Sequence, residues 1–223
     1  MYAVAIDGPA GAGKSTISRA VAQKIGFLYV DTGALYRAVA YDMLENRIDP
    51  SDIHAVRERL AHITVRLGYE NGDQQIYLNG KNITEKIRTP QISAAASTVS
   101  SIGEVRQFLF SLQQDIAREN HIIMDGRDIG TVVLPNAQVK IYLTADVEER
   151  ARRRFVELQQ KGIHTDFEEV LADVKRRDEN DMNRSIAPLR QAPDAVLVNT
   201  SHLNFDQSVQ AVLAVIEERI GRE

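Results

Sequence analysis

The sequence predicts an α/β protein, a five-stranded parallel sheet with helices on both faces. The first observation is a recurrence of short apolar runs of strand length, at residues 2–6, 27–30, 121–125, 139–143 and 195–198. The second is apolar helical spacing between these runs, as in Ile17, Val21 and Ile25. The third is a length of 223 residues with 43% hydrophobic content, which suffices for one core with small insertions.

A glycine-rich motif separates the first strand from the first helix. It reads Gly8-Pro9-Ala10-Gly11-Ala12-Gly13-Lys14-Ser15, which matches the phosphate-binding loop G-x-x-x-x-G-K-[ST], and the helix that follows ends before Gly26. Glycines let backbone N–H groups approach phosphate oxygens, and the helix N-terminus adds positive potential. Lys14 would reach the β- and γ-phosphates, and the Ser15 hydroxyl would ligate Mg²⁺. The motif predicts a nucleoside triphosphate but does not specify the acceptor; the flanking elements argue against an ordinary glycine turn.

The second strand ends in polar residues. Residues 27–30 are followed by Asp31-Thr32-Gly33 and then by a helical pattern over 34–43 that includes Tyr36 and Arg37. Ligands of parallel sheets bind beyond the carboxyl ends of the strands, so these side chains are candidates for a site. Arg37 either clamps an anion or is an exposed helix arginine, and position alone does not decide.

The next segment changes character. Pro50-Ser51-Asp52 predicts a helix start, and residues 63–67 and 75–78 then alternate with period two around Asn71-Gly72-Asp73. This pattern predicts an antiparallel hairpin or meander inserted into the parallel fold, with either a binding role or none. Thr89-Pro90 starts a further helix, whose small residues at 91–101 suit close approach by a ligand or another helix, and an amphipathic helix follows over 105–116.

The third strand ends in Asp125, a candidate to support the Mg²⁺ shell through water. The turn Gly126-Arg127-Asp128-Ile129-Gly130 follows it, and glycines around an Arg and an Asp indicate a site; a local Arg–Asp turn pair is the structural alternative. The strand at 139–143 comes next. The last strand, at 195–198, precedes a closing helix that we expect to end before Gly221.

Residues 146–190 are dense in charge of both signs, which predicts two helices with a break near Gly162. The pattern Thr165-Asp166-Phe167-Glu168 predicts a capping box at the start of the second helix. Arg150, Arg153 and Arg154 share one helix face. Two interpretations stay open: a lid that closes over phosphates, or salt-bridged surface helices.

Composition narrows the class of protein. The net charge of −4 gives no global basic field for nucleic acid, and the absence of cysteine excludes disulfides and thiolate zinc sites. The five histidines lack metal-ligand spacing, no run of 18 apolar residues occurs, and no signal-peptide pattern opens the chain. We expect a cytoplasmic, monomeric protein that acts on small molecules and contacts neither nucleic acid nor membrane.

Several motifs resemble one family. IDGPAGAGKST, DTGALYR, DGRDIGTVV, and RRDENDMNR followed by APL are similar, in family order, to bacterial cytidylate kinases (CMP/dCMP kinases), which are nucleoside monophosphate kinases. Residues 63–84 resemble the extended CMP-binding insert of bacterial members. The resemblance implies a single P-loop kinase unit over 1–223 with a fold similar to adenylate kinase. The implied unit has a core at 1–35, 85–150 and 190–223 and a lid at 151–185. Its nucleoside monophosphate-binding insert, at 36–100, overlaps the core boundary.

The resemblance also implies an activity, the phosphorylation of CMP or dCMP to CDP or dCDP by ATP with Mg²⁺. Thr32 and Asp128 match family positions that contact cytosine, and Thr32 keeps the hydroxyl of the more frequent serine. By the same resemblance, Lys14, Arg127 and Arg184 are catalytic. ATP would contact Gly8, Pro9, Ala10, Gly11, Ala12, Gly13, Lys14, Ser15 and Thr16, and the acceptor would contact Thr32, Tyr36, Arg37, Ser97, Arg106, Arg127, Asp128, Arg177, Asp181 and Arg184.

Three alternatives remain. The nearest is another small P-loop kinase that acts on UMP, AMP or a non-nucleotide acceptor. A GTP-dependent switch would carry N-K-x-D, and Asn79-Gly80-Lys81-Asn82 does not match it. A nucleotide-binding module without catalysis is disfavoured, because a pure binder needs no second set of phosphate-binding arginines.

Overall fold

The computed structural model describes residues 1–221, which form two compact units. The first unit comprises Val30–Asn120, together with Met1, and the second comprises Tyr2–Tyr29 and the chain from His121 onward. Each unit has its own apolar core. Within residues 1–221, no helix combines the length and hydropathy needed to cross a bilayer.

The central sheet has five parallel strands, as predicted. Their order is β2-β6-β1-β7-β8, so that β1 lies in the middle and pairs in parallel with β6 and β7. At the carboxyl edge, Asp7 of β1 stands opposite Gly126 of β6 and Tyr142 of β7. The strands are β1 (Ala3–Asp7), β2 (Leu28–Asp31), β6 (Ile122–Gly126), β7 (Val139–Thr144) and β8 (Val196–Asn199).

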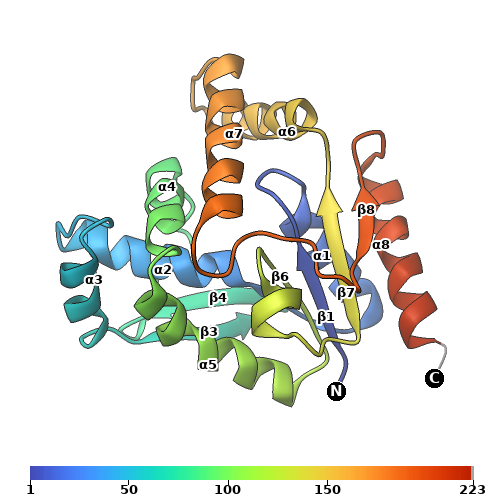
Figure 1. The fold of residues 1–223 in the computed structure, drawn as a ribbon, viewed down its shortest axis with the longest axis horizontal. Helices are drawn as coiled ribbons and strands as arrows, with labels where there is room; N and C mark the ends of the chain where they lie inside the picture. The colour runs from blue at the N-terminus through green and yellow to red at the C-terminus, as the bar shows by residue number, and fades with distance from the viewer. Residues whose placement is uncertain (222–223) are drawn as a thin grey trace. The chain divides into compact units, whose positions relative to one another are not determined.

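Two helices of the second unit pack against each other and on this sheet, as Figure 1 shows for α1 (Lys14–Ile25) and α8 (Phe205–Ile220). Ile17 and Val21 of α1 and Val212 of α8 share one buried cluster with strand residues. Each such side chain contributes about 1.5–3 kcal/mol by burial. Both helices end where the sequence predicts, before Gly26 and Gly221.

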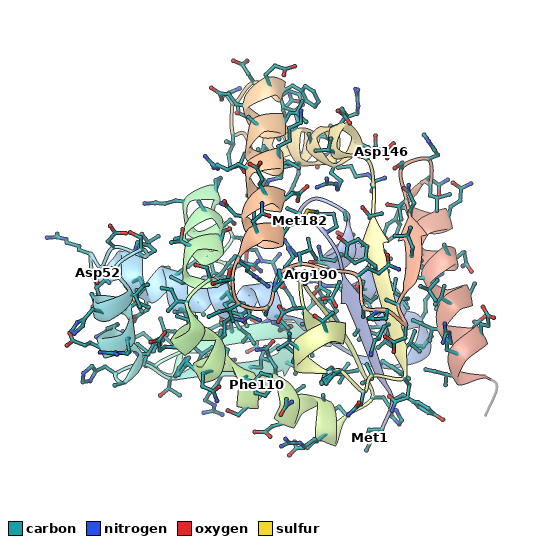
Figure 2. All side chains as sticks on the ribbon, in the orientation of Figure 1. Met1, Asp52, Phe110, Asp146, Met182 and Arg190 are labelled. Atoms are coloured by element: carbon teal, nitrogen blue, oxygen red, sulfur yellow. The ribbon has the colours of Figure 1, made fainter. Side chains whose placement is uncertain are left out.

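A pair of helices follows the carboxyl end of β7: α6 (Val147–Gln160) and α7 (Phe167–Asn183), which pack together. Figure 2 labels Asp146 where α6 begins and Met182 near the end of α7. The rings of Phe155 and Phe167 meet edge to face with centroids 6.0 Å apart. The two helices predicted for this charged segment are therefore both present.

The predicted capping box at Thr165 is wrong. The N-cap of α7 is Asp166, and its side chain makes no capping hydrogen bond. The Thr165 hydroxyl instead donates to a carboxylate oxygen of Glu169 at 2.9 Å. A capping hydroxyl oxygen would accept a backbone N–H, whereas this hydroxyl donates to a charged group in the first turn, and the helix begins one residue later than predicted.

Four helices build most of the first unit: α2 (Thr32–Glu45), α3 (Ile53–Leu60), α4 (Pro90–Val99) and α5 (Gly103–Glu119). Asp52 and Thr89 cap α3 and α4 by accepting backbone N–H bonds, at the predicted starts. α4 packs against α2, and Ala95 and Ala96 are buried in that cluster. The small residues of 91–101 therefore serve helix–helix approach.

A three-stranded antiparallel sheet completes the first unit, in the order β3-β4-β5. Its strands are β3 (Val65–Glu70), β4 (Asp73–Leu78) and β5 (Lys81–Asn82). The predicted turn Asn71-Gly72 joins β3 and β4, with φ values of 53° and 84°. Ile76 of β4 is buried in the core that the helices share. The inserted segment is thus a meander.

Candidate active site

The phosphate-binding loop spans the junction between β1 and α1. Gly8 has φ +153°, and a Cβ there would lie 1.9 Å from the carbonyl oxygen of Leu143, so only glycine fits. Gly13 is the N-cap of α1; among the residues that the structure describes, no side chain caps this helix, and no acid lies in its first turn. The first N–H groups of α1 and its macrodipole thus make an anion site.

Lys14 is buried within this loop. Its Nζ donates to the carbonyl oxygen of Pro9 at 2.7 Å, and Lys14 as a whole is 6% exposed. Burial, and after it the positive charge of Arg127, lower the pKa of Lys14 from 10.5 to about 7 against the opposing effect of Asp125. A phosphate anion beside Lys14 would stabilise the protonated amine and so raise this pKa again.

Ser15 and Asp125 lie together, as the predicted magnesium site requires. The Ser15 hydroxyl donates to Asp125 Oδ2 at 2.9 Å, and the Tyr29 hydroxyl donates to Asp125 Oδ1 at 3.1 Å. Mg²⁺ prefers oxygen ligands and usually takes one or two from protein, with water and phosphate completing the shell. A hydroxyl and a carboxylate fit that donor set. Tyr29 orients the carboxylate and is a site residue that the sequence reasoning missed.

Asp7 is a second residue that the sequence reasoning missed. Its carboxylate accepts the N–H groups of Ile129 and Gly130, both at 2.7 Å, and so fixes the π-helical turn η1 (Ile129–Val133) that follows Asp128. Burial raises the pKa of Asp7 to about 6, against the lowering effect of these two hydrogen bonds. The orientation of Asp128 therefore depends on a carboxylate at the end of β1.

The arginines predicted to bind the acceptor form a cluster with two carboxylates in the second unit. Arg127 Nε lies 2.8 Å from Asp181 Oδ2, and an Arg184 guanidinium nitrogen lies 3.1 Å from Asp128 Oδ1. Burial would raise the pKa of Asp181, but the charge and hydrogen bond of Arg127 hold it below its usual value. Burial and the nearby Arg127 lower the pKa of Arg177. Arg127 and Arg184 thus each pair with a carboxylate, and Arg127 also interacts with Asp125 and Asp178, so the cluster holds guanidinium groups in place beside several acids.

The arginines of α6 are largely engaged in ion pairs. Arg150 is buried: it donates to the carbonyl oxygens of Ala145 and Ala10 and pairs with Asp178 at 2.7 Å. Asp178 in turn accepts the N–H of Ala10 at 3.3 Å. Arg150 and Asp178 thereby hold both backbone groups of one residue of the phosphate-binding loop, which is a supporting role rather than a phosphate contact.

Two further arginines of α6 are also paired. Arg153 pairs with Glu149 at 3.0 Å and donates to the backbone and side chain of Thr200, and Arg154 pairs with Glu157 at 2.8 Å. For these side chains the structure favours the salt-bridged alternative.

The expected acceptor residues of the first unit gather at the start of α2. Asp31 caps this helix by accepting the N–H of Ala34 at 3.0 Å and pairs with one Arg37 nitrogen at 2.8 Å. Arg37 Nε is buried and has no hydrogen-bond partner in the described part of the chain, which leaves a donor for an anion. Thr32, the first residue of α2, is buried.

Two more expected residues of this unit are in contact. The Arg106 guanidinium carbon lies 5.7 Å from the centroid of the Tyr36 ring, a cation–π arrangement, and the same side chain donates to the Ser100 carbonyl oxygen at 3.3 Å. Ser97 is half-buried on α4, and its carbonyl oxygen accepts the Ser100 hydroxyl at 2.9 Å.

A triphosphate loop with a buried lysine, on a parallel sheet that also carries an arginine cluster, defines the class: a P-loop phosphotransferase. A gluconokinase from Sinorhizobium meliloti shares this fold, with a TM-score of 0.50 at 11% identity over 99% of this chain and 95% of its own. At that identity the likeness concerns the fold alone.

Sequence comparison is more specific. The cytidylate kinase family profile matches residues 4–218. Cytidylate kinases from Caldicellulosiruptor bescii and Halalkalibacterium halodurans are 48% and 44% identical, over 99% and 97% of this chain and 97% and 98% of their own lengths. The chain belongs to the cytidylate kinase family, phosphotransferases whose acceptor is a phosphate group, and ATP is the phosphoryl donor that this kinase family implies.

Proposed function

We propose that this protein transfers the γ-phosphoryl group of ATP to CMP and to dCMP, which gives ADP and CDP or dCDP. The observation that carries the proposal is the family match over residues 4–218, with relatives named cytidylate kinase at high coverage. The conjunction of a triphosphate loop with a separate arginine–carboxylate cluster supports it, because a monophosphate acceptor needs its own anion site.

The donor side of the site is assigned to residues 8–16, with Lys14 on the β- and γ-phosphates. We assign magnesium to Ser15, with Asp125 acting through water, and the chemistry it would supply is neutralisation of phosphate charge. The hydrogen bond between Ser15 and Asp125 supports this assignment.

The acceptor side is assigned by role. The base contacts Thr32, Asp128, Ser97 and Arg106, with Tyr36 beside Arg106. The phosphate contacts Arg37, Arg127 and Arg184. The sugar contacts Arg177 and Asp181. The buried Arg37 Nε, which has no hydrogen-bond partner among the described residues, supports the phosphate role, and the proximity of Arg127, Arg177 and Arg184 supports it independently. The pair Asp128–Arg184 would fix the carboxylate that reads the base.

The chemistry requires positioning and charge compensation. An acceptor phosphate oxygen must lie in line with the γ-phosphorus, and Lys14, Arg127 and Arg184 neutralise charge on the transferring group. No general base is needed, because the acceptor phosphate is largely ionised near neutral pH. We assign residues 151–185, which hold most of α6 and all of α7, to a lid that excludes water during transfer.

The wider assignments follow the same proposal. We assign the whole chain to one P-loop kinase unit, with the core at 1–35, 85–150 and 190–223 and the acceptor-binding insert at 36–100. We expect a cytoplasmic monomer that binds only small molecules; the net charge of −4 and the lack of cysteine support this expectation.

The test is an ADP-release assay with ATP, Mg²⁺ and one acceptor at a time: CMP, dCMP, UMP, AMP or GMP. We expect kcat/KM for CMP and dCMP to exceed the others at least about tenfold, the discrimination that a few hydrogen bonds to the base supply. If another monophosphate is preferred, the base assignments are wrong although the phosphate chemistry stands. If none reacts while ATP binds, the proposed acceptor class is wrong.

A further inference from the structure

One side chain of the antiparallel sheet reaches the backbone at the start of α2. Gln74 of β4 accepts the N–H of Asp31 at 2.7 Å and donates its amide N–H to the carbonyl oxygen of Asp31 at 3.1 Å. Gln74 is 7% exposed. Its neighbour Gln75 is half-buried and accepts a hydrogen bond from Asn82 within the small sheet.

The Gln74 amide makes the two hydrogen bonds that the backbone of a neighbouring strand would otherwise make. Asp31 is the last residue of β2, which stands at the end of the strand order, so no other strand within residues 1–221 pairs with its outer edge. A primary amide offers one acceptor and one donor, and Gln74 sets both against the two backbone groups of a single residue. Two hydrogen bonds fix the peptide planes on both sides of the Asp31 Cα, which one bond would leave free to rotate.

Asp31 is the residue on which the neighbouring acceptor-binding groups depend. Its carboxylate caps α2 at Ala34 and holds one arm of Arg37. Burial would raise the pKa of Asp31, but the Arg37 charge and hydrogen bond lower it, so the carboxylate stays ionised and paired. Thr32 follows directly in the chain, and its position is set by the same peptide.

We infer that Gln74 is a positioning residue for the acceptor nucleotide: it locks the Asp31–Thr32 turn, and thereby presets the Thr32 hydroxyl and the Arg37 guanidinium before the nucleotide binds. This inference rests on the proposed function, because it takes CMP as the acceptor that these groups contact. It gives the β3–β5 meander a part in acceptor recognition, and so decides between the two roles that the sequence leaves open.

The expected effect is selective. Without the two bonds the turn samples other conformations, and the binding-competent one must be selected at a cost in apparent affinity. We expect KM for CMP to rise about tenfold, which corresponds to about 1.4 kcal/mol. KM for ATP should stay within about twofold of the wild type, because the donor is assigned to residues 8–16.

The experiment compares two variants that make the same chemical change at adjacent positions of one strand. Gln74→Met keeps an unbranched side chain of similar length but removes the amide, and Gln75→Met does the same on the other face of β4. We expect the CMP effect in Gln74→Met alone. Equal KM values for CMP in the two variants, or a parallel rise in both KM values of Gln74→Met, would overturn the inference.

A second measurement does not depend on turnover. Amide hydrogen exchange at Asp31 should be faster in Gln74→Met than in the wild type and Gln75→Met, because the N–H has lost its acceptor. Unchanged exchange would also overturn the inference. If the wild-type protein forms no ADP with CMP, the proposed function fails and this inference fails with it, whereas a wild type that uses CMP and a silent Gln74→Met refute the inference alone.

Discussion

At the scale of single residues, Lys14 shows how the free protein prepares for an anion. The folded chain gives up the Lys14 proton near pH 7, whereas the unfolded chain keeps it until about 10.5. Between these values the unfolded state binds more protons, so the free energy of unfolding rises with pH over this window. Burial of this amine therefore lowers stability at neutral pH, and a bound triphosphate would reverse that effect.

Replacement of Lys14 should separate stability from activity. In Lys14→Met we expect kcat to fall on the order of 10²-fold or more, as for other single electrostatic groups. We also expect the free energy of unfolding at pH 7 to increase on the order of 1 kcal/mol or more, since the buried charge is gone. The free energy of unfolding, measured by urea titration, should rise from pH 7 to 9 in the wild type and change less in the variant. A kcat within threefold of the wild type would exclude the assigned role.

Asp128 should determine base preference. In Asp128→Ala we expect the ratio of kcat/KM for CMP over UMP to fall about tenfold or more, because a hydrogen bond that reads the base is lost. Asp173→Ala is the matched control, since it removes a carboxylate that pairs with Arg176 on α7. An unchanged CMP:UMP ratio in Asp128→Ala would refute the base contact.

Individual residues also show what the sequence could predict. The loop at 8–15 is a local motif, so Lys14 and Ser15 were identifiable from spacing alone. Asp7 and Tyr29 were not, because each acts through partners more than ninety residues away in the chain, at Ile129 and Asp125. No local pattern records such a pairing; the only signal was a carboxylate at the end of an apolar run.

At the scale of elements, α6 and α7 hold the phosphate-binding loop through one buried ion pair. Arg150 and Asp178 bond the carbonyl and the N–H of Ala10 as well as each other. Removal of one partner leaves a buried charge, which costs about 3–5 kcal/mol, whereas apolar replacement of both can be nearly neutral.

A double-mutant cycle tests whether this pair serves stability, the loop, or both. We expect Asp178→Leu to lower the free energy of unfolding by about 3 kcal/mol or more and Arg150→Met/Asp178→Leu to recover most of that loss. KM for ATP should stay raised in the double variant, because Ala10 has lost both bonds. Urea unfolding and ATP kinetics are the measurements; a double variant with normal KM for ATP would assign the pair to stability alone.

Element starts and ends differed in how well the sequence predicted them. Caps that depend on one residue, such as Asp52 and Thr89, were predicted, since their partners lie three residues away. The cap at Thr165 was not, because spacing does not show which partner a side chain takes: the hydroxyl donates to Glu169, and the N-cap is Asp166. The arginine face of α6 was ambiguous for the same reason: helical spacing places the charges but does not select their partners.

At the scale of the whole molecule, the fold class followed from the alternation of strand and helix patterns, and the observed sheet confirms it. The strand order did not follow. Apolar runs show which segments are strands, but the pairing of β1 with β6 and β7 is set by contacts across more than a hundred residues. The division into two apolar cores was equally invisible in the linear pattern.

The tight passage of the chain at Gly8 has a consequence for heredity. Because the Leu143 carbonyl oxygen occupies the space where any side chain would begin, every substitution at Gly8 must displace backbone. At Gly26, Gly72 and Gly80 no described atom lies within 4 Å of the position that a Cβ would take. Substitutions there strain the backbone but meet no neighbour. We therefore expect those three positions to tolerate variation better than Gly8, where a missense allele should lose most of the activity.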